Sequence, residues 1–369
     1  MAGDDHQPRR LFHVFPTFAV GGAQVRFARI AARLGQRARH TVVALSGDFS
    51  AREKMPDGVN VDYVEPPANP RLSFLNIPQM RRTIRSGSPD LLVTYNWGSV
   101  DWALANAVAP IAAHVHFEDG FGPEEADRQL PRRVWYRRIA LCRTRALVVP
   151  SLTLQRIATE IWRQPESRVR YVPNGIEIER FAGEGDPTLL PTGTGPVIGT
   201  VAALRPEKNL GRLLRAFAVV HASLPDARLA IVGDGGVRGD LERQAADLGI
   251  ADAVVFTGHI AEPARVVPLF DVFALSSDTE QMPLSVLEAM AAAKPVVSVD
   301  VGDVRTMVAE GNQRFVVPRH DEVAFAKAML ALASDSALRQ SLGAANREAA
   351  RTRFPPGDMF ETYERLLLE

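Results

Sequence analysis

Two cations in the second half of the sequence could act on a phosphate group. Arg205 and Lys208 lie in the segment Leu204–Asn209, directly after the apolar run Val197–Ala202. Cations at the end of a parallel strand can neutralise the charge that develops on a departing diphosphate. Loop cations are as often merely solvated, so the spacing alone leaves both interpretations open.

Glu280 and Glu288 follow the apolar run Val272–Leu275, the first in a loop and the second one helical turn further on. A carboxylate in a cleft accepts several hydrogen bonds, so the first could bind sugar hydroxyls and the second a ribose. Ser285 and Glu288 also form a capping-box pattern, which would give Glu288 a structural role in its own helix.

Gly21 and Gly22 follow the apolar run Leu11–Pro16 and precede a helical pattern over Ala23–Leu34. Paired glycines let the backbone approach a phosphate at the positive end of a helix. A flexible turn between a strand and a helix is the commoner origin of such a pair.

His114, His116 and Glu118 alternate along an expected strand, which places them on one face. His-x-His is a metal-ligand spacing, so a metal-dependent hydrolase that uses His114 and His116 is an alternative function. A metal site needs further ligands, and no other His or Cys cluster lies nearby in the sequence. Structural histidines are the commonest outcome of such a pattern.

Two further segments contain glycines that indicate turns. Gly233–Gly239 follows the apolar run Arg228–Val232 and resembles a dinucleotide fingerprint, but the next expected strand, Val254–Thr257, lacks the acid that such a site needs at its end. A nicotinamide-dependent dehydrogenase is therefore a weak alternative. Pro173 and the Asn-Gly pair after it predict a tight turn with a positive φ.

Short apolar runs alternate with helical patterns along the chain, which predicts β-α units with a largely parallel sheet in each half. The Gly- and Pro-rich segment 181–196 is expected to be a linker. We therefore predict two doubly wound, Rossmann-like α/β domains, residues 1–180 and 197–369, with a ligand between the carboxyl ends of their sheets and a last helix able to pack back on the first domain. The other expected strands are Thr41–Leu45, Leu91–Tyr95, Ala112–Phe117, Ala146–Pro150, Val296–Val299 and Arg314–Val317.

The composition favours a globular enzyme or binding protein, with 46% hydrophobic and 23% charged residues among 369. Cys142 is the single cysteine, and the first ten residues lack the apolar core of a signal peptide, so a reducing cytoplasm is expected. No apolar run reaches the roughly 18 residues of a membrane-spanning helix.

Residues 1–180 hold 25 Lys and Arg against 18 Asp and Glu, and the remainder holds the reverse. Within Arg128–Arg145, several arginines surround Trp135 and Tyr136, a mixture suited to the edge of an anionic bilayer. A solvated helix face is an equally good interpretation. Nothing in the sequence indicates a nucleic-acid partner. The arginines nearest the two aromatic residues are Arg132, Arg133, Arg137 and Arg138.

Taken together, these segments resemble the retaining glycosyltransferases of family 4, which have the GT-B fold. The family pattern runs Gly-Gly-x-Glu/Gln, a histidine near the fourth strand, Pro-Asn-Gly-Ile/Val-Asp, Pro-Glu-Lys, Ile-Val-Gly-x-Gly and Glu-x7-Glu. The resemblance covers nearly the whole chain and keeps the order of the motifs. The matching residues are Gly21–Gln24, His116, Pro173–Glu177, Pro206–Lys208, Ile231–Gly235, Glu280 and Glu288.

The resemblance implies catalytic roles for His116, Lys208, Arg205 and Glu280. Lys208 would meet the donor phosphates, Glu280 the transferred sugar and Glu288 the ribose, while His116 would lie beside the sugar. No acceptor-binding residue is implied. The implied donor-binding residues are Gly21, Gly22, Lys208, Arg205, Gly233, Met282, Pro283, Leu284 and Glu288.

Three departures from the family pattern concern the donor. Ala202–Leu204 replaces Gly-Arg-Leu, and we assign Arg205 in place of the missing arginine. Pro283 has no N–H for a donor where the family has a glycine-rich segment. Thr306 stands where a glutamate is frequent, so an unusual sugar specificity is expected.

The implied activity is a hexosyltransferase reaction from a UDP or GDP sugar to a hydroxyl of a glycan or lipid-linked acceptor, in cell-surface polysaccharide synthesis. Neither a metal nor another cofactor is required in this family. The expected location is the cytoplasm, with peripheral contact at the inner face of the membrane. A catalytically silent module that binds nucleotide sugars is a further alternative.

Overall fold

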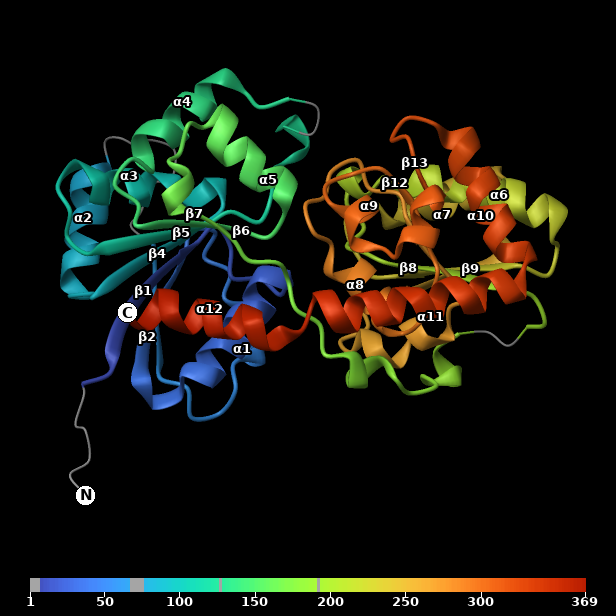
Figure 1. Cartoon of the computed structure of the whole chain (residues 1–369), viewed down its shortest axis with the longest axis horizontal. Helices are drawn as coiled ribbons and strands as arrows, with labels where there is room; N and C mark the ends of the chain where they lie inside the picture. The colour runs from blue at the N-terminus through green and yellow to red at the C-terminus, as the bar shows by residue number, and fades with distance from the viewer. Residues whose placement is uncertain (1–6, 67–75, 126–127, 191–192) are drawn as a thin grey trace. The chain divides into compact units, whose positions relative to one another are not determined.

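The computed structural model of the chain describes residues 7–66, 76–125, 128–190 and 193–369. The chain forms two compact units (Figure 1). Residues 1–173 and 357–369 make up the first unit, and residues 174–356 make up the second.

The first unit contains a sheet of seven parallel strands in the order β3-β2-β1-β4-β5-β6-β7. The sequence predicts the five central strands because their apolar runs are long and buried. It does not predict β3 and β7, which lie at the two edges and are only four and three residues long. The strands are β1 Arg9–Phe15, β2 Ala38–Ala44, β3 Val61–Val64, β4 Leu91–Tyr95, β5 Ala113–Phe117, β6 Ala146–Val149 and β7 Val169–Tyr171.

Helices cover both faces of this sheet (Figure 1). On one face, Phe27 of α1 shares a core with Tyr363 and Leu367 of α12. On the other face, Met80 of α2 and Trp102 of α3 pack together. The last helix therefore completes the core of the first unit. The helices are α1 Gly22–Leu34, α2 Ile77–Ser86, α3 Val100–Val108, α4 Pro131–Ala140, α5 Leu152–Arg156 and α12 Pro356–Leu368.

The second unit contains six parallel strands in the order β10-β9-β8-β11-β12-β13. The sequence predicts all six, although β13 starts two residues later than expected. The strands are β8 Val197–Val201, β9 Arg228–Val232, β10 Val254–Gly258, β11 Val272–Leu275, β12 Val296–Val299 and β13 Val316–Val317. The two doubly wound sheets confirm the predicted fold class.

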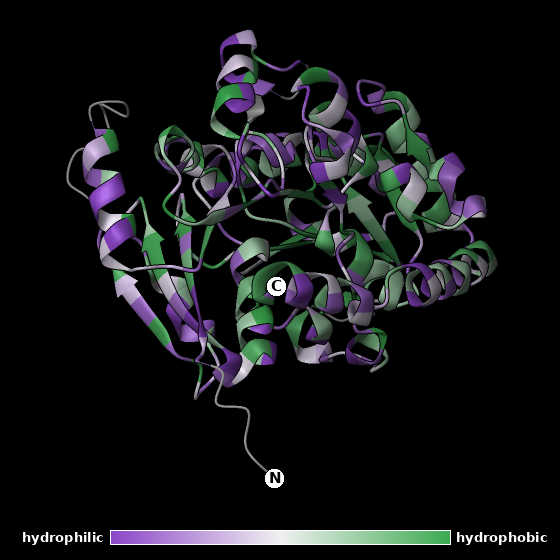
Figure 2. Cartoon of the chain, turned by 60° about the vertical axis from the view of Figure 1, so that its left-hand side comes forward, coloured by the Kyte–Doolittle hydropathy of each residue, from purple (hydrophilic) through white to green (hydrophobic). Residues whose placement is uncertain are grey.

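In the second unit α6, α7, α10 and α11 each have buried and exposed residues, whereas α8 has no exposed residue. Figure 2 shows helices banded in hydrophobic and hydrophilic colours. One core joins the apolar faces of these helices to the strands. The helices are α6 Leu210–Ser223, α7 Arg238–Asp247, α8 Leu284–Ala291, α9 Val304–Met307, α10 Glu322–Ser334 and α11 Ser336–Arg353.

The segment expected to be a linker, residues 181–196, lies inside the second unit. Asp186 donates its backbone N–H to the carbonyl of Arg265 at 2.7 Å, and the two side chains form an ion pair. Gly185 has a φ of 80° and lies against the same residue. These contacts tie the segment to the second unit, and the division of the chain lies earlier, after Pro173.

In both sheets the strand order reverses beside the first strand, between β1 and β4 and between β8 and β11. Ligands of open α/β sheets bind beyond the carboxyl ends of the strands at such a point. The loops that follow these four strands are therefore the candidate ligand-binding segments.

Candidate functional site

The loop after β8 places Lys208 at the carboxyl edge of the second sheet. Pro206–Lys208 form a 3-10 turn, which a proline favours at its start because its φ is already helical. Asn209 then adopts a left-handed conformation with a φ of 42° and caps α6 by accepting a hydrogen bond from the N–H of Arg212. Asparagine is one of the few non-glycine residues that tolerate this conformation.

Lys208 and Glu280 form an ion pair that joins the loops after β8 and β11. The Nζ of Lys208 lies 2.6 Å from the Oε1 of Glu280, and the two side chains are 24% and 13% exposed. The pair forms because β8 and β11 are neighbours in the sheet. An accessible ammonium beside an accessible carboxylate can offer a cation to a phosphate and an acceptor to a hydroxyl. The structure thus brings these two predicted residues together.

Arg205 lies in the same loop as Lys208 but outside the ion pair. Its side chain is exposed, and its guanidinium has no partner in the described part of the chain. Ala203, which stands where the family arginine is usual, is exposed as well. The Arg205 side chain is therefore available to an anionic ligand.

Pro173 and the two residues after it do not form the predicted tight turn. Neither Asn174 nor Gly175 has a positive φ. Instead, the Nδ2 of Asn174 donates a hydrogen bond of 3.0 Å to the carbonyl of Met282, and a β-carbon on Gly175 would clash with Pro356. The tight-turn prediction was wrong. Asn174 and Gly175 are required here because they pack closely against their neighbours, and this packing holds the loop that contains Met282.

The segment of predicted donor-binding residues after Glu280 is largely covered. Met282 and Pro283 are buried, whereas Leu284 is partly exposed at the start of α8. Gly302, with a φ of 53°, packs behind the loop so closely that a β-carbon would clash with the carbonyl of Glu280. Leu284 is therefore the member of this segment most accessible to a ligand.

Glu288 does not belong to a capping box. Pro283 is the N-cap of α8, so Ser285 already lies inside the helix and no side chain caps it. The half-buried Glu288 carboxylate has no hydrogen-bond partner among the described residues. Burial raises the pKa of Glu288 to about 7, an effect that Arg180 opposes and Glu262 strengthens. Such a carboxylate is suited to accept hydrogen bonds from ligand hydroxyls, which stabilise its ionised form.

Gly233 is required by packing. A β-carbon at Gly233 would clash with the carbonyl oxygen of Ala202, and its φ of 139° is unfavourable for other residues. Its N–H already donates to the carbonyl of Gly258 at 2.9 Å. Gly235 approaches the backbone of Leu204 in the same way. These glycines therefore let the turn after β9 support the loop of Lys208, and the Gly233 N–H is not available to a donor.

In the first unit, Gly21 and Gly22 form the predicted turn before a helix. α1 begins at Gly22, and Gly21 is its extended N-cap, with a φ of −168°. The first turn of α1 contains no acid, so the positive end of the helix dipole is not compensated by an acidic side chain of that turn. Contact of these glycines with a phosphate stays a prediction.

Asn96 follows β4 in a strained conformation, with φ of 57° and ψ of 177°, a region that is nearly restricted to glycine. Its N–H donates to the carbonyl of Phe117, and its Oδ1 accepts from the N–H of Asp119, both at 2.7 Å. Strain of this kind concentrates at functional sites. The sequence contains no signal for it, because the conformation depends on the neighbouring strand.

His114 and His116 lie on one face of β5, as their alternation predicts, and Glu118 follows directly after the strand beside His116. The Oγ1 of Thr94 contacts the Nε2 of His114 at 2.8 Å and the Nδ1 of His116 at 2.7 Å. Thr144 binds the other ring nitrogen of His114, and burial lowers the pKa of that histidine to about 3. A metal site that uses both histidines would have to break these contacts. No group of three or more metal-binding side chains occurs within the described ranges.

His116 belongs to a fully buried polar cluster. Its Nε2 lies 3.7 Å from the Oε2 of Glu118, and the Nε of Arg137 lies 3.5 Å from the same oxygen. Arg137 binds Glu125 through both terminal nitrogens, at 3.0 and 3.1 Å. Neither Glu118 oxygen has a hydrogen-bond partner in the residues that the structure describes. The His116 imidazole is thus not exposed to a ligand in this conformation.

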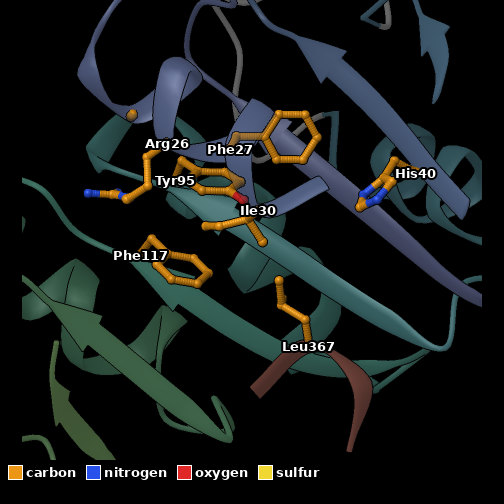
Figure 3. Close-up of a pocket in the computed structure, with 8 residues that line it drawn as sticks. Arg26, Phe27, Ile30, His40, Tyr95, Phe117 and Leu367 are labelled. Carbon is orange, nitrogen blue, oxygen red and sulfur yellow. The ribbon is translucent and has the colours of Figure 1, made fainter. Parts of the chain in front are cut away.

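A small cavity in the first unit lies beside α1 and α12 (Figure 3). Its volume is about 10 Å³, which is the space of about one water molecule. His40 and Tyr95 contribute polar side chains to its lining, and the Nε2 of His40 has no partner among the described residues. Burial lowers the pKa of His40 to about 4. The cavity is too small for a sugar or a nucleotide.

The sequence motifs do not identify Asn209, Asp278 or Asn96. An asparagine directly before a helix is an N-cap signal that could have identified Asn209. Asp278 lies two residues before Glu280, but its importance depends on partners about 70 residues away in the sequence. None of the helices in the described part of the chain is both long and apolar enough to cross a bilayer.

Two family models match the chain. The model described as "Glycosyltransferase Family 4" matches residues 20–180, and the one described as "Glycosyl transferases group 1" matches residues 186–349. Together they cover parts of both units.

Curated relatives show similarity over part of their length. The chain is 33% identical over 202 residues to a GDP-mannose-dependent alpha-(1-6)-phosphatidylinositol monomannoside mannosyltransferase of Mycolicibacterium smegmatis, covering 50% of this chain and 52% of the relative. It is 31% identical over 278 residues to a D-inositol 3-phosphate glycosyltransferase of Stackebrandtia nassauensis, covering 70% of this chain and 60% of the relative. The matches thus span between about half and 60% of these two relatives.

Solved structures share the fold over nearly the whole chain. HepE of Anabaena in complex with UDP superposes with a TM-score of 0.78 at 19% identity, covering 97% of this chain and 99% of HepE. WaaG, a glycosyltransferase involved in lipopolysaccharide biosynthesis, superposes with a TM-score of 0.76 at 18% identity and the same coverage.

Proposed function

The chain belongs to the group 1 glycosyltransferases of family 4, and we propose that it transfers a sugar from a UDP or GDP donor to a hydroxyl of a glycan or lipid-linked acceptor. The observation that carries this proposal is the accessible pair of Lys208 and Glu280 at the reversal point of the second sheet. A nucleotide sugar presents both groups that the pair can bind, namely phosphate oxygens and sugar hydroxyls.

In the proposed reaction the bond between the anomeric carbon and the diphosphate oxygen breaks, and its electrons remain on the diphosphate. Lys208 neutralises the charge that develops there, and the exposed Arg205 reaches the same group. The acceptor oxygen bonds to the anomeric carbon on the same face, so configuration is retained, and its proton leaves with the diphosphate. Glu280 binds hydroxyls of the transferred sugar, and Glu288 binds the ribose.

The donor class is supported by two similar proteins. The mycobacterial relative is named for its use of GDP-mannose, and HepE was crystallised with UDP. The name of the same mycobacterial relative specifies a phosphatidylinositol mannoside acceptor, which supports a lipid-linked acceptor here. Contacts of the donor with Gly21, Gly22 and His116 stay predictions.

Contact with an anionic membrane is a proposal that rests on one face of α4. Trp135 and Ile139, one helical turn apart, are 63% and 57% exposed. The guanidinium of Arg138 lies 4.8 Å from the centre of the Trp135 ring, and Arg132 is exposed on the same helix. An apolar side chain flanked by cations suits the interface of an acidic bilayer, where a lipid-linked acceptor would be found.

A thermal-shift screen against UDP, GDP and ADP sugars tests the donor assignment, because a bound donor stabilises the folded protein. Turnover with the identified donor then tests the site. Lys208→Ala should lower kcat by about 10²–10³-fold, the usual loss for one preorganised charge contact. Turnover of Lys208→Ala at the wild-type rate would refute the site. Release of nucleotide from the donor without any acceptor distinguishes an enzyme from a silent binding module.

A further inference from the structure

Asp278 holds together the two loops that contain Lys208 and Glu280. Its N–H donates a hydrogen bond of 2.8 Å to the carbonyl of Glu207. Its Oδ2 accepts one of 3.0 Å from the side-chain amide of Asn209. Asp278 thus contacts the residues on both sides of Lys208 while lying two positions before Glu280 in its own loop.

Arg212 reinforces the same connection from inside the second unit. Its side chain is 5% exposed, and its Nη2 lies 2.9 Å from the Oδ1 of Asp278. Its Nη1 donates to the carbonyl of Ser276 at 2.9 Å, and the hydroxyl of Ser276 donates to the carbonyl of Lys208 at 2.9 Å. Both the backbone and the side chain of Lys208 are therefore bound to the loop after β11.

The arrangement requires an uncommon backbone at Asn209. The left-handed φ of 42° turns the chain from the Lys208 turn into α6 and points its amide at Asp278. A buried guanidinium needs a charged partner, because an unpaired buried charge is costly. Asp278 provides the closer of two carboxylate partners of Arg212, since Glu322 lies 3.7 Å from its Nε, and the same Asp278 carboxylate accepts from Asn209.

We propose that Asp278, through Asn209 and Arg212, is a positioning residue that fixes the separation of Lys208 and Glu280 for the departing diphosphate and the transferred sugar. This inference rests on the proposed function. Reaction rates depend steeply on such placement, and a misplacement of about 1 Å can cost about 10²-fold. This role requires no contact between Asp278 and the donor.

The variant Asp278→Asn tests this role, because it keeps the size of the side chain and removes its charge. Asp271→Asn is the matched control. Asp271 precedes β11, and its carboxylate accepts from the N–H of Val197 at 2.9 Å and lies 3.5 Å from Arg339, at the opposite end of the same two strands. We expect kcat to fall about 10²-fold in Asp278→Asn with little change in nucleotide affinity, and to stay near the wild-type value in Asp271→Asn.

A double-mutant cycle with Lys208→Ala separates positioning from a general loss of structure. If Asp278 acts through Lys208, Asp278→Asn should slow Lys208→Ala little further. Single-turnover assays with radiolabelled donor and excess enzyme measure these slow variants. An equal loss in both backgrounds, or an equal loss in the Asp271→Asn control, would overturn the positioning role. Wild-type turnover of Lys208→Ala would instead refute the proposed site itself.

The variant Asn209→Gly gives an independent check, since glycine keeps the left-handed backbone. It removes the bond to Asp278 together with the cap of α6, and replacing an asparagine cap by glycine costs only a few tenths of a kcal/mol. It should lower kcat in the same direction as Asp278→Asn without unfolding the protein. An unchanged kcat in Asn209→Gly would contradict the part assigned to Asn209.

Discussion

The Nζ of Lys208 and the Oε1 of Glu280 lie 2.6 Å apart, although 72 residues separate them in the sequence. In the absence of donor each charge is therefore satisfied by the other. A donor that binds Lys208 through phosphate and Glu280 through sugar hydroxyls must replace this contact with two new ones.

The variant Glu280→Gln should therefore lower sugar transfer without lowering the affinity for the nucleotide. It frees Lys208 for phosphate, so the affinity for UDP or GDP without a sugar should stay the same or increase. Sugar transfer should fall by about 10²-fold, because a charged acceptor of hydrogen bonds is lost. Calorimetric titration and a transfer assay measure the two effects. Parallel losses of both would show that Glu280 does not act on the sugar.

Nucleotide binding should depend on pH through Glu288. The pKa of Glu288 is raised to about 7 because the carboxylate is buried, so the protonated form predominates below pH 7. Ribose hydroxyls that donate to the carboxylate favour the ionised form, so binding should release a proton and weaken as the pH falls below 7. Calorimetric titration in buffers of different ionisation enthalpy detects the proton that is released on binding.

The variant Glu288→Gln is the control for this pH dependence. In Glu288→Gln the affinity should be lower and nearly independent of pH between 6 and 8. A wild-type affinity that does not change over this range would contradict a contact between the ribose and the carboxylate. The unliganded protein should lose stability as the pH rises through 7, because a raised pKa favours the folded state only while the group is protonated.

Gly233→Ala should destabilise the second unit, because the added β-carbon clashes with the carbonyl of Ala202 in a left-handed backbone. We expect the free energy of unfolding to fall by about 3 kcal/mol. Gly236→Ala is the matched control, since nothing lies within 4 Å of its β-carbon. Denaturant unfolding followed by circular dichroism compares the two, and equal effects would contradict this account.

Membrane contact through α4 should be lost in the double variant Trp135→Ala and Ile139→Ala. Binding to vesicles of phosphatidylglycerol and phosphatidylcholine should weaken at least about tenfold, because each large apolar side chain contributes roughly 1.5–3 kcal/mol when buried. Val323→Ala, at a 64% exposed position on α10, should bind like the wild type. Co-sedimentation at low and high salt measures the binding, and wild-type binding by the double variant would refute the proposed surface.

The sheets follow from the sequence because apolar runs such as Leu91–Tyr95, separated by helical patterns, are typical of the buried strands of a parallel sheet. The edge strands β3 and β7 cannot be predicted in this way, because they are short, partly exposed and lack such an apolar run. The start of α8 is set by Pro283, which a capping-box pattern at Ser285 does not reveal.

The motifs predict that Lys208 and Glu280 both belong to the donor site, because each lies in the loop after an apolar run. Their contact follows from the pairing of β8 with β11, which only the structure shows. The motifs do not predict Asp278, whose contacts with Asn209 and Arg212 arise only when the folded loops meet. They also do not predict the burial of His116, since a buried and an exposed histidine can occupy the same position in a strand.

The chain passes from the first unit to the second after Pro173 and returns at Gly357, so α12 completes a core that was begun by α1. During synthesis, the first unit cannot form the ring contact of Phe117 with Tyr363 until the whole second unit has left the ribosome. The second unit is a single stretch of sequence and can fold as it emerges, while the first must wait for α12, which follows the second unit in the chain. A chain stopped anywhere before residue 357 would therefore leave exposed the part of the earliest-made core that Met359, Tyr363 and Leu367 cover.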